Sequence, residues 1–202
     1  ANPEGGVVVG GQVAISTPDS RTLRIDQGSQ NAIVNWKRFD IAPGEAVEIH
    51  QPSAASAILN RVTGSTEASR LLGRLTANGQ VMLVNPNGVM IGRDAVIDVA
   101  ALVATTADIP NADFMAGGRA FSIPGNPDAA VTNAGTINVR EGGLVALVAP
   151  GVENSGVITA RLGRVAMASG DTVTLDFYGD GLLEVAADSS LLREVVDSDG
   201  NP

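Results

Sequence analysis

The chain contains no cysteine, so neither disulfide bonds nor thiolate metal sites contribute to its fold. It contains a single histidine, His50, which excludes a metal site built from several histidines. Aromatic residues make up only 3% of the sequence, whereas hydrophobic residues make up 44%. The core must therefore consist of Val, Ile, Leu and Ala, whose small side chains suit regular stacked layers.

Positive charge is also scarce: the 202 residues carry a formal net charge of -9. This balance argues against nucleic acid as a partner, because phosphates require a surface rich in Lys and Arg, and it disfavours anionic membrane surfaces. No apolar run is long enough for a membrane helix, and no signal peptide opens the chain. We therefore predict a protein that is not embedded in a membrane.

Helical periodicity is nearly absent, and short β-prone runs bounded by Gly, Asn, Asp or Pro recur instead. Residues 7–9, 13–15 and 23–25 predict strands near the start, and residues 46–50 alternate as in a half-buried strand. Only residues 67–72 suggest a helical turn. The chain is thus predicted to be all-β.

Residues 111–130 have little periodicity and contain several Gly and Pro residues. We interpret this segment as an excursion from the main body, an inserted loop or short hairpin, in preference to a domain boundary.

The second half contains an internal repeat. The segment that begins at Asn133 returns 21 residues later at Asn154, and the segment that begins at Gly143 returns 20 residues later at Gly163. This period is typical of a solenoid in which each repeat forms one coil. The frame of a leucine-rich repeat is missing, so the pattern favours a parallel β-helix, with Asn133 and Asn154 stacked at equivalent turns.

Catalytic signals are weak. A Ser-His-Asp triad would have to use His50, and no Gly-x-Ser-x-Gly elbow surrounds any serine. Four carboxylates are candidates for a cluster of the kind that β-helical carbohydrate enzymes use: Asp94, Asp98, Asp108 and Asp113. Their spacing instead follows strand ends and turns. The sequence therefore predicts neither an enzyme nor a cofactor.

The most informative segment is Asn85-Pro86-Asn87-Gly88, which lies between two apolar runs. Pro86 presets a turn value of φ, while Asn87 and Gly88 tolerate positive φ. The tetrapeptide predicts a tight turn between two strands.

This turn is the last of an ordered series of motifs. The series begins with the segment containing Trp36 and Phe39 and continues with Asn60-Arg61-Val62-Thr63 and with residues 72–81. The order closely resembles the two-partner secretion domain at the N-terminus of filamentous-haemagglutinin-type exoproteins. The resemblance is strong over residues 30–110. It continues by pattern beyond them.

The resemblance implies a right-handed parallel β-helix with an N-terminal cap and extra-helical hairpin or loop excursions. It implies a secretion-targeting domain of a large exoprotein or adhesin, recognised in the periplasm by POTRA domains of a cognate Omp85-type outer-membrane transporter. The domain would nucleate β-helix folding after export and reach the surface or medium of a Gram-negative bacterium. Host cell or matrix ligands would belong to the remainder of the exoprotein.

The family's Asn-Pro-Asn-Gly and Asn-Arg-Val-Thr motifs map onto residues 85–88 and 60–63. A further Asn-Pro-Asn-Leu motif of one branch is missing, and Gln51-Pro52-Ser53-Ala54 is the nearest segment. The chain is therefore more similar to the high-molecular-weight adhesin branch. We expect Asn85 and Asn87 to act mainly by forming the turn and setting coil register.

We expect one secretion domain over residues 1–202. Its expected parts are N-terminal strands and cap (1–35), motif-bearing early coils (36–110), the excursion (111–130), regular coils (131–187) and a tail or linker (188–202). Trp36 and Phe39 are interpreted as a cap or anchor of the early coils, with an exposed partner contact as the alternative. Two other functions remain open, a self-standing adhesin or ligand-binding module and, less favoured, a β-helical carbohydrate enzyme.

Overall fold

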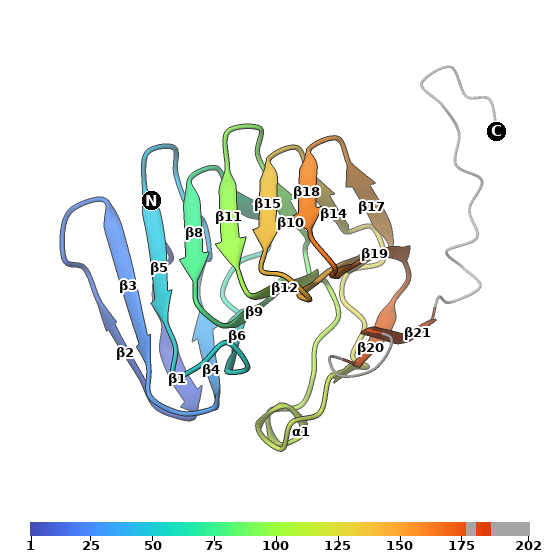
Figure 1. The fold of residues 1–202 in the computed structure, drawn as a ribbon, viewed down its shortest axis with the longest axis horizontal. Helices are drawn as coiled ribbons and strands as arrows, with labels where there is room; N and C mark the ends of the chain where they lie inside the picture. Colours follow the sequence, from blue (N-terminus) through green and yellow to red (C-terminus); the bar gives the residue numbers. More distant parts are fainter. Residues whose placement is uncertain (177–180, 187–202) are drawn as a thin grey trace.

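A computed structural model describes residues 1–176 and 181–186 of the chain, and almost all of its regular structure is β (Figure 1). Short strands stack in sequence order into a parallel β-solenoid of about six turns. The predicted all-β, β-helical fold is confirmed.

Three sheets form the sides of the solenoid. The first sheet has the order β1-β4-β6-β9-β12-β16-β19, the second β18-β15-β11-β8-β5-β3-β2 and the third β17-β14-β10-β7. The strands of the first sheet are β1 (Val7–Gly10), β4 (Asn31–Trp36), β6 (Ala57–Val62), β9 (Gln80–Val84), β12 (Ala101–Thr105), β16 (Leu144–Ala149) and β19 (Arg164–Ser169). Those of the second are β2 (Val13–Ser16), β3 (Thr22–Gln27), β5 (Ala46–His50), β8 (Arg74–Ala77), β11 (Val96–Val99), β15 (Thr136–Val139) and β18 (Val157–Ala160). Those of the third are β7 (Ser69–Leu71), β10 (Val89–Ile91), β14 (Ala130–Asn133) and β17 (Gly151–Asn154).

The internal repeat is in register in the structure. Asn133 pairs with Asn154 between β14 and β17, and Nδ2 of Asn133 donates to Oδ1 of Asn154 at 2.9 Å. Val145 on β16 likewise pairs with Val165 on β19. The predicted stacking of equivalent asparagines is confirmed.

The first sheet is buried on both faces over its central strands. One face lines the aliphatic interior of the solenoid, and the other lies under a second apolar cluster outside it. All residues of β6, β12 and β16 are consequently buried. The near-continuous apolar sequences of β12 and β16 follow from this two-sided burial, as in other parallel sheets covered on both faces, whereas β6 also buries Asn60 and Arg61.

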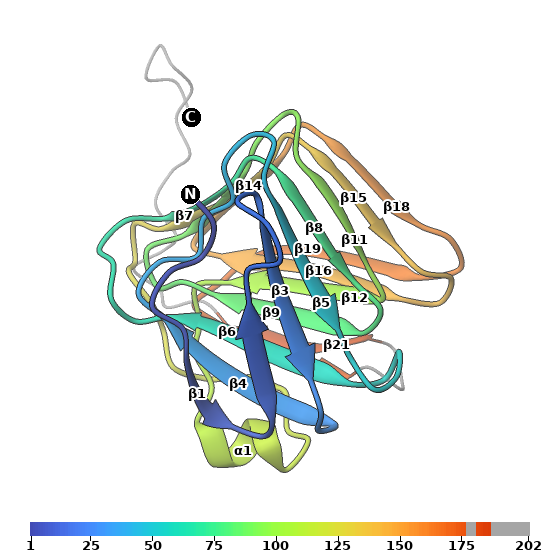
Figure 2. The same ribbon diagram turned by 90° about the vertical axis from the view of Figure 1, so that its left-hand side faces the viewer.

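The N-terminal end of the solenoid is covered by β1 and β2, the first two strands of the chain. Unlike the strands of the coils, they pair antiparallel, β1 with β4 and β2 with β3 (Figure 2). This arrangement confirms the predicted N-terminal cap.

The excursion contains a helix that the sequence did not predict. α1 (Asn111–Met115) is followed by the two-residue strand β13 (Ala120–Phe121), and Phe114 and Phe121 cover the outer face of the first sheet. A single helical turn is too short to show a 3.6-residue pattern. Within the expected excursion, the structure therefore has a helix and a strand instead of a simple loop or hairpin.

Two further expectations differ from the structure. The helical turn expected at residues 67–72 is wrong: Ser69–Leu71 forms β7, because parallel pairing with β10 outweighs local propensity. The coils expected up to residue 187 end at Ser169. Beyond it, β20 (Thr172–Asp176) and β21 (Gly181–Ala186) form an antiparallel sheet with β13. The expected tail at 188–202 lies outside the described residues.

Within the described ranges, no helix has the length and apolar character needed to cross a membrane.

Candidate functional site

Asn85 is the buried centre of the predicted turn, between β9 and β10. Its side chain is 1% exposed. Nδ2 donates to the carbonyl of Glu67 at 3.0 Å and lies 3.1 Å from Oγ of Ser69, while Oδ1 accepts the backbone N–H of Asn87 at 2.9 Å. Gly88 N–H closes the turn on the Asn85 carbonyl at 3.0 Å. Asn85 thus shapes its own turn and binds the loop of the preceding coil.

The rest of the turn contacts both neighbouring coils. Nδ2 of Asn87 donates to the Ser65 carbonyl at 3.0 Å, in the preceding coil. On the other side, the Pro86 carbonyl accepts the N–H of Asn126 at 2.9 Å. Gly88 has φ of +111°, and a Cβ there would lie 2.5 Å from the Ala130 carbonyl oxygen. Glycine is therefore required both by the backbone and by the following coil.

Asn60 joins the second motif to Trp36. Its side chain is fully buried inside the solenoid, where Oδ1 accepts the indole N–H of Trp36 at 3.0 Å. The Trp36 and Phe39 rings meet edge to face, with centroids 5.6 Å apart. Both rings are 1% exposed. They anchor the early coils from within, so in this folded form neither ring offers a partner an exposed aromatic surface.

Arg61 points to the opposite face of β6 and is 7% exposed. Its Nε donates to Oδ1 of Asp108 at 2.8 Å, and Nη2 donates to the Ile109 carbonyl at 2.7 Å. Nη1 donates to Oδ1 of Asn111 at 2.7 Å and of Asn35 at 3.1 Å. These bonds compensate for burying the charge and bind β6 to the start of the excursion.

Val62 and Thr63 complete the second motif next to Trp36. Val62 is buried opposite Trp36 in the β4–β6 register, and the Thr63 N–H donates to the Trp36 carbonyl at 2.8 Å. The two motifs lie at the same end of adjacent strands, because Arg61 pairs with Val84, the residue before the turn. The structure therefore brings them together at one corner of the solenoid.

A pair of buried glutamines, which the sequence pattern did not predict, connects neighbouring coils. Gln27 and Gln51 are both buried, and Nε2 of Gln51 donates to Oε1 of Gln27 at 3.1 Å. Oε1 of Gln51 accepts the Gly79 N–H at 2.8 Å. The two glutamines are 24 residues apart, which is close to the length of one coil, and this spacing is the signal from which the pair could have been predicted. Gln51, which stands where the missing motif would be, thus stabilises a second corner.

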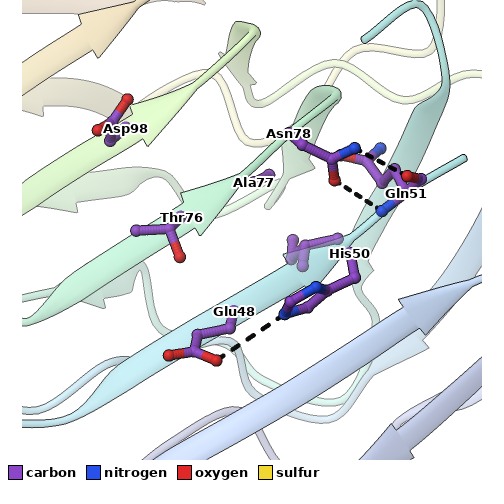
Figure 3. A pocket seen from close by; sticks show the side chains of 8 residues that line it. Glu48, His50, Gln51, Thr76, Ala77, Asn78 and Asp98 are labelled. Carbon is purple, nitrogen blue, oxygen red and sulfur yellow. Dashed lines mark hydrogen bonds and ion pairs between the residues drawn. The ribbon is translucent and has the colours of Figure 1, made fainter. Parts of the chain in front are cut away.

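The aspartates considered for catalysis do not form a cluster. In the described part of the chain, no three His, Cys, Asp or Glu side chains are placed to hold a metal ion. Asp108 is the partner of Arg61. Asp98 lines an open groove of about 510 Å³ across β5, β8 and β11 (Figure 3). His50, also in this groove, lies 3.9 Å from Glu48, and both are about half exposed.

The geometry therefore concentrates the family motifs in coil-to-coil contacts instead of a reaction centre, and the comparisons with known proteins agree. Residues 1–193 match the TPS secretion domain. The chain belongs to this family. It is similar in structure to the HMW1 secretion domain from Haemophilus influenzae, with a TM-score of 0.82 and 34% identity, over 93% of this chain and 50% of that one. The predicted likeness of this TPS domain to the high-molecular-weight adhesin branch is confirmed.

Two curated relatives of this TPS domain are heme/hemopexin-binding proteins of Haemophilus influenzae. One is 35% identical over 98% of this chain and 22% of its own length, and the other is 44% identical over 53% of this chain and 11% of its own length. This TPS domain thus spans less than a quarter of the length of each of these two relatives.

Proposed function

We propose that this TPS domain is recognised in the periplasm by the POTRA domains of a cognate outer-membrane transporter and that it nucleates β-helix folding after export. Membership of the family over residues 1–193 carries the proposal. We further propose that residues 1–202 act as one secretion domain, and that the transporter directs the chain to the medium or the cell surface.

The last coil of the solenoid supports the nucleation step. Val165 and Met167 on β19 continue the rows of Val145 and Leu147, which are buried in the interior. The two β19 side chains are 46% and 49% exposed, because no described strand covers them. A following coil would bury them and so gain about 25 cal/mol for each Å² of apolar surface removed from water.

We propose that the transporter binds the chain before these coils close. Strand addition to a POTRA sheet needs free main-chain N–H and C=O groups, which the parallel pairing of the folded coils consumes. Folding outside the cell would then withdraw the chain from the transporter and favour export by mass action.

A binding measurement tests this order of events. Purified POTRA domains of the cognate transporter are titrated with the chain freshly diluted from urea and, in parallel, with the fully folded chain. The unfolded chain is expected to bind more tightly. Equal binding and equal export of a pre-folded chain would contradict the proposal.

The two relatives are named for binding haem or hemopexin, so we asked whether this chain has a site for haem. The one histidine of this chain lies in a groove lined by Glu48, Thr76, Asn78 and Asp98. Ile49 and Ala77 are the apolar residues of this open groove, and the remaining lining is polar, unlike the mostly apolar walls of a site for a porphyrin. We therefore assign no haem site to this chain.

A further inference from the structure

The first strand of the chain ends the first sheet and leaves one edge free. β1 pairs on one side with β4, and no described strand pairs with its other side (Figure 2). Val7, Val8 and Val9 are 59%, 38% and 40% exposed. An exposed apolar edge strand is a template for addition of another strand, and proteins usually protect such edges.

The usual protection by charge is missing here. Residues 5–18, which include β1 and β2, contain no charged side chain. Apart from β1 and β2, every edge strand whose side chains are described contains a charged residue or lies directly next to one. These residues are Arg70 in β7, Arg119 before β13, Glu153 in β17, Arg161 after β18 and Arg164 in β19. Of the two uncharged edges, β2 turns its larger side chains, Val13 and Ile15, toward the core, whereas β1 exposes three valines.

The inner side of β1 is held in place independently of any partner. Gly5 and Gly11, on either side of the strand, have φ of +66° and +73°, and a Cβ on Gly11 would lie 2.4 Å from the Asn31 carbonyl oxygen. Gly6 lies against the Trp36 ring, where a Cβ would meet a ring carbon at 2.7 Å. An incoming strand can therefore add to the outer edge without displacing β4.

We propose that the free edge of β1 is the docking edge for an extended strand of the transporter's POTRA domains, which rests on the proposed function above. β1 is the first strand in the chain, so it can bind the transporter along one edge and later accept β4 along the other. Pairing at β1 would hold the chain at the transporter in the periplasm until the other coils fold outside the cell and withdraw it. A heterologous strand fits this edge better than a second copy of the chain, because two copies of net charge -9 repel each other.

Secretion of edge variants tests the proposal. The 202-residue chain is exported behind a signal sequence in cells containing its transporter, and periplasm is compared with medium. The test variant is Val7→Lys/Val9→Lys, which places charge on the edge strand. The matched control is Val157→Lys on β18, because Val157 is exposed to the same 59% but lies at the opposite end of the solenoid.

The test variant is expected to lower secretion by about tenfold or more, while the control is secreted like the wild type. Thermal unfolding of both purified variants checks that they fold. If the double lysine variant does not fold, Val9→Lys alone replaces it.

The other possible outcomes distinguish failure of the docking edge from failure of the proposed function. Normal secretion of the β1 variant, or equal loss in both variants, would overturn the docking edge and leave the proposed function standing. Retention of the wild type in the periplasm despite its transporter would overturn the proposed function itself. A wild-type dimer that the β1 variant converts to monomer, with secretion unchanged, would show that the edge pairs copies of this chain.

Discussion

Nε of Arg61 lies 2.8 Å from Oδ1 of Asp108, a residue 47 positions later in the chain. This bond ties a strand of the early coils to the segment that leads into the excursion. The two motifs that identify the family are therefore built into contacts between coils, and Asn60, Arg61 and Asn85 are each buried with their polar groups bonded.

Replacing Arg61 should destabilise the domain strongly. Arg61→Met removes the charged partner of Asp108, whose Oδ1 keeps only the bond from the Ile109 N–H, and removes the Arg61 donor from the Ile109 carbonyl. This change is expected to lower the free energy of unfolding by about 2–4 kcal/mol. Arg24→Met is the control, because Arg24 bonds Asp26 on the surface, where a pair contributes about 1 kcal/mol at most. Urea denaturation of both variants measures the difference. Equal losses would contradict the structural role of Arg61.

Replacing Asn85 should impair secretion through folding. Asn85→Ala removes the bonds to Glu67 and Asn87 and to the Ser69 hydroxyl, and we expect a loss of about 2 kcal/mol. Asn126→Ala is the control, since the exposed Asn126 side chain accepts one bond within its own turn. The free energy of unfolding is measured on each purified variant, and secretion of each variant is measured in cells that contain the transporter. An undiminished fold with lost secretion would indicate direct recognition of Asn85 by the transporter.

Gly88 should be less replaceable than another glycine of positive φ. Gly117 has φ of +95° with nothing near its would-be Cβ, so Gly117→Ala measures backbone strain alone, about 1–2 kcal/mol. Gly88→Ala adds the clash with the Ala130 carbonyl. Its unfolding midpoint in urea should therefore be clearly lower. If the two variants were equally stable, the contact with the next coil would not constrain this position.

The Trp36–Asn60 bond should show non-additive energetics. Trp36→Phe leaves the buried Oδ1 of Asn60 without its donor. It should lower the free energy of unfolding by about 1–3 kcal/mol in addition to the effect of the lost packing. Trp36→Phe/Asn60→Leu removes both partners and should recover part of that loss. A double-variant loss equal to the sum of the single losses would show that the two side chains are not coupled.

The sequence predicted what depends on repetition and local turn chemistry. The 21-residue return from Asn133 to Asn154 predicted both the coils and the stacked asparagines, and Asn-Pro-Asn-Gly predicted the turn. It did not predict contacts that the solenoid creates between distant segments. Asp108 was considered only as a carboxylate candidate, because nothing in the local pattern relates it to Arg61.

Segments with weak local signals were predicted least well. Residues 67–72 were predicted as a helical turn because their strand is only three residues long and depends on pairing with β10. The single turn of α1 was missed because its stability depends on Phe114 packing against the first sheet. In both cases tertiary contacts outweigh local propensity.

The most direct test of the account is export of this chain, behind a signal sequence, in cells with and without its cognate transporter. The account predicts that the chain appears in the medium only when the transporter is present. Retention in the periplasm of both strains would contradict it.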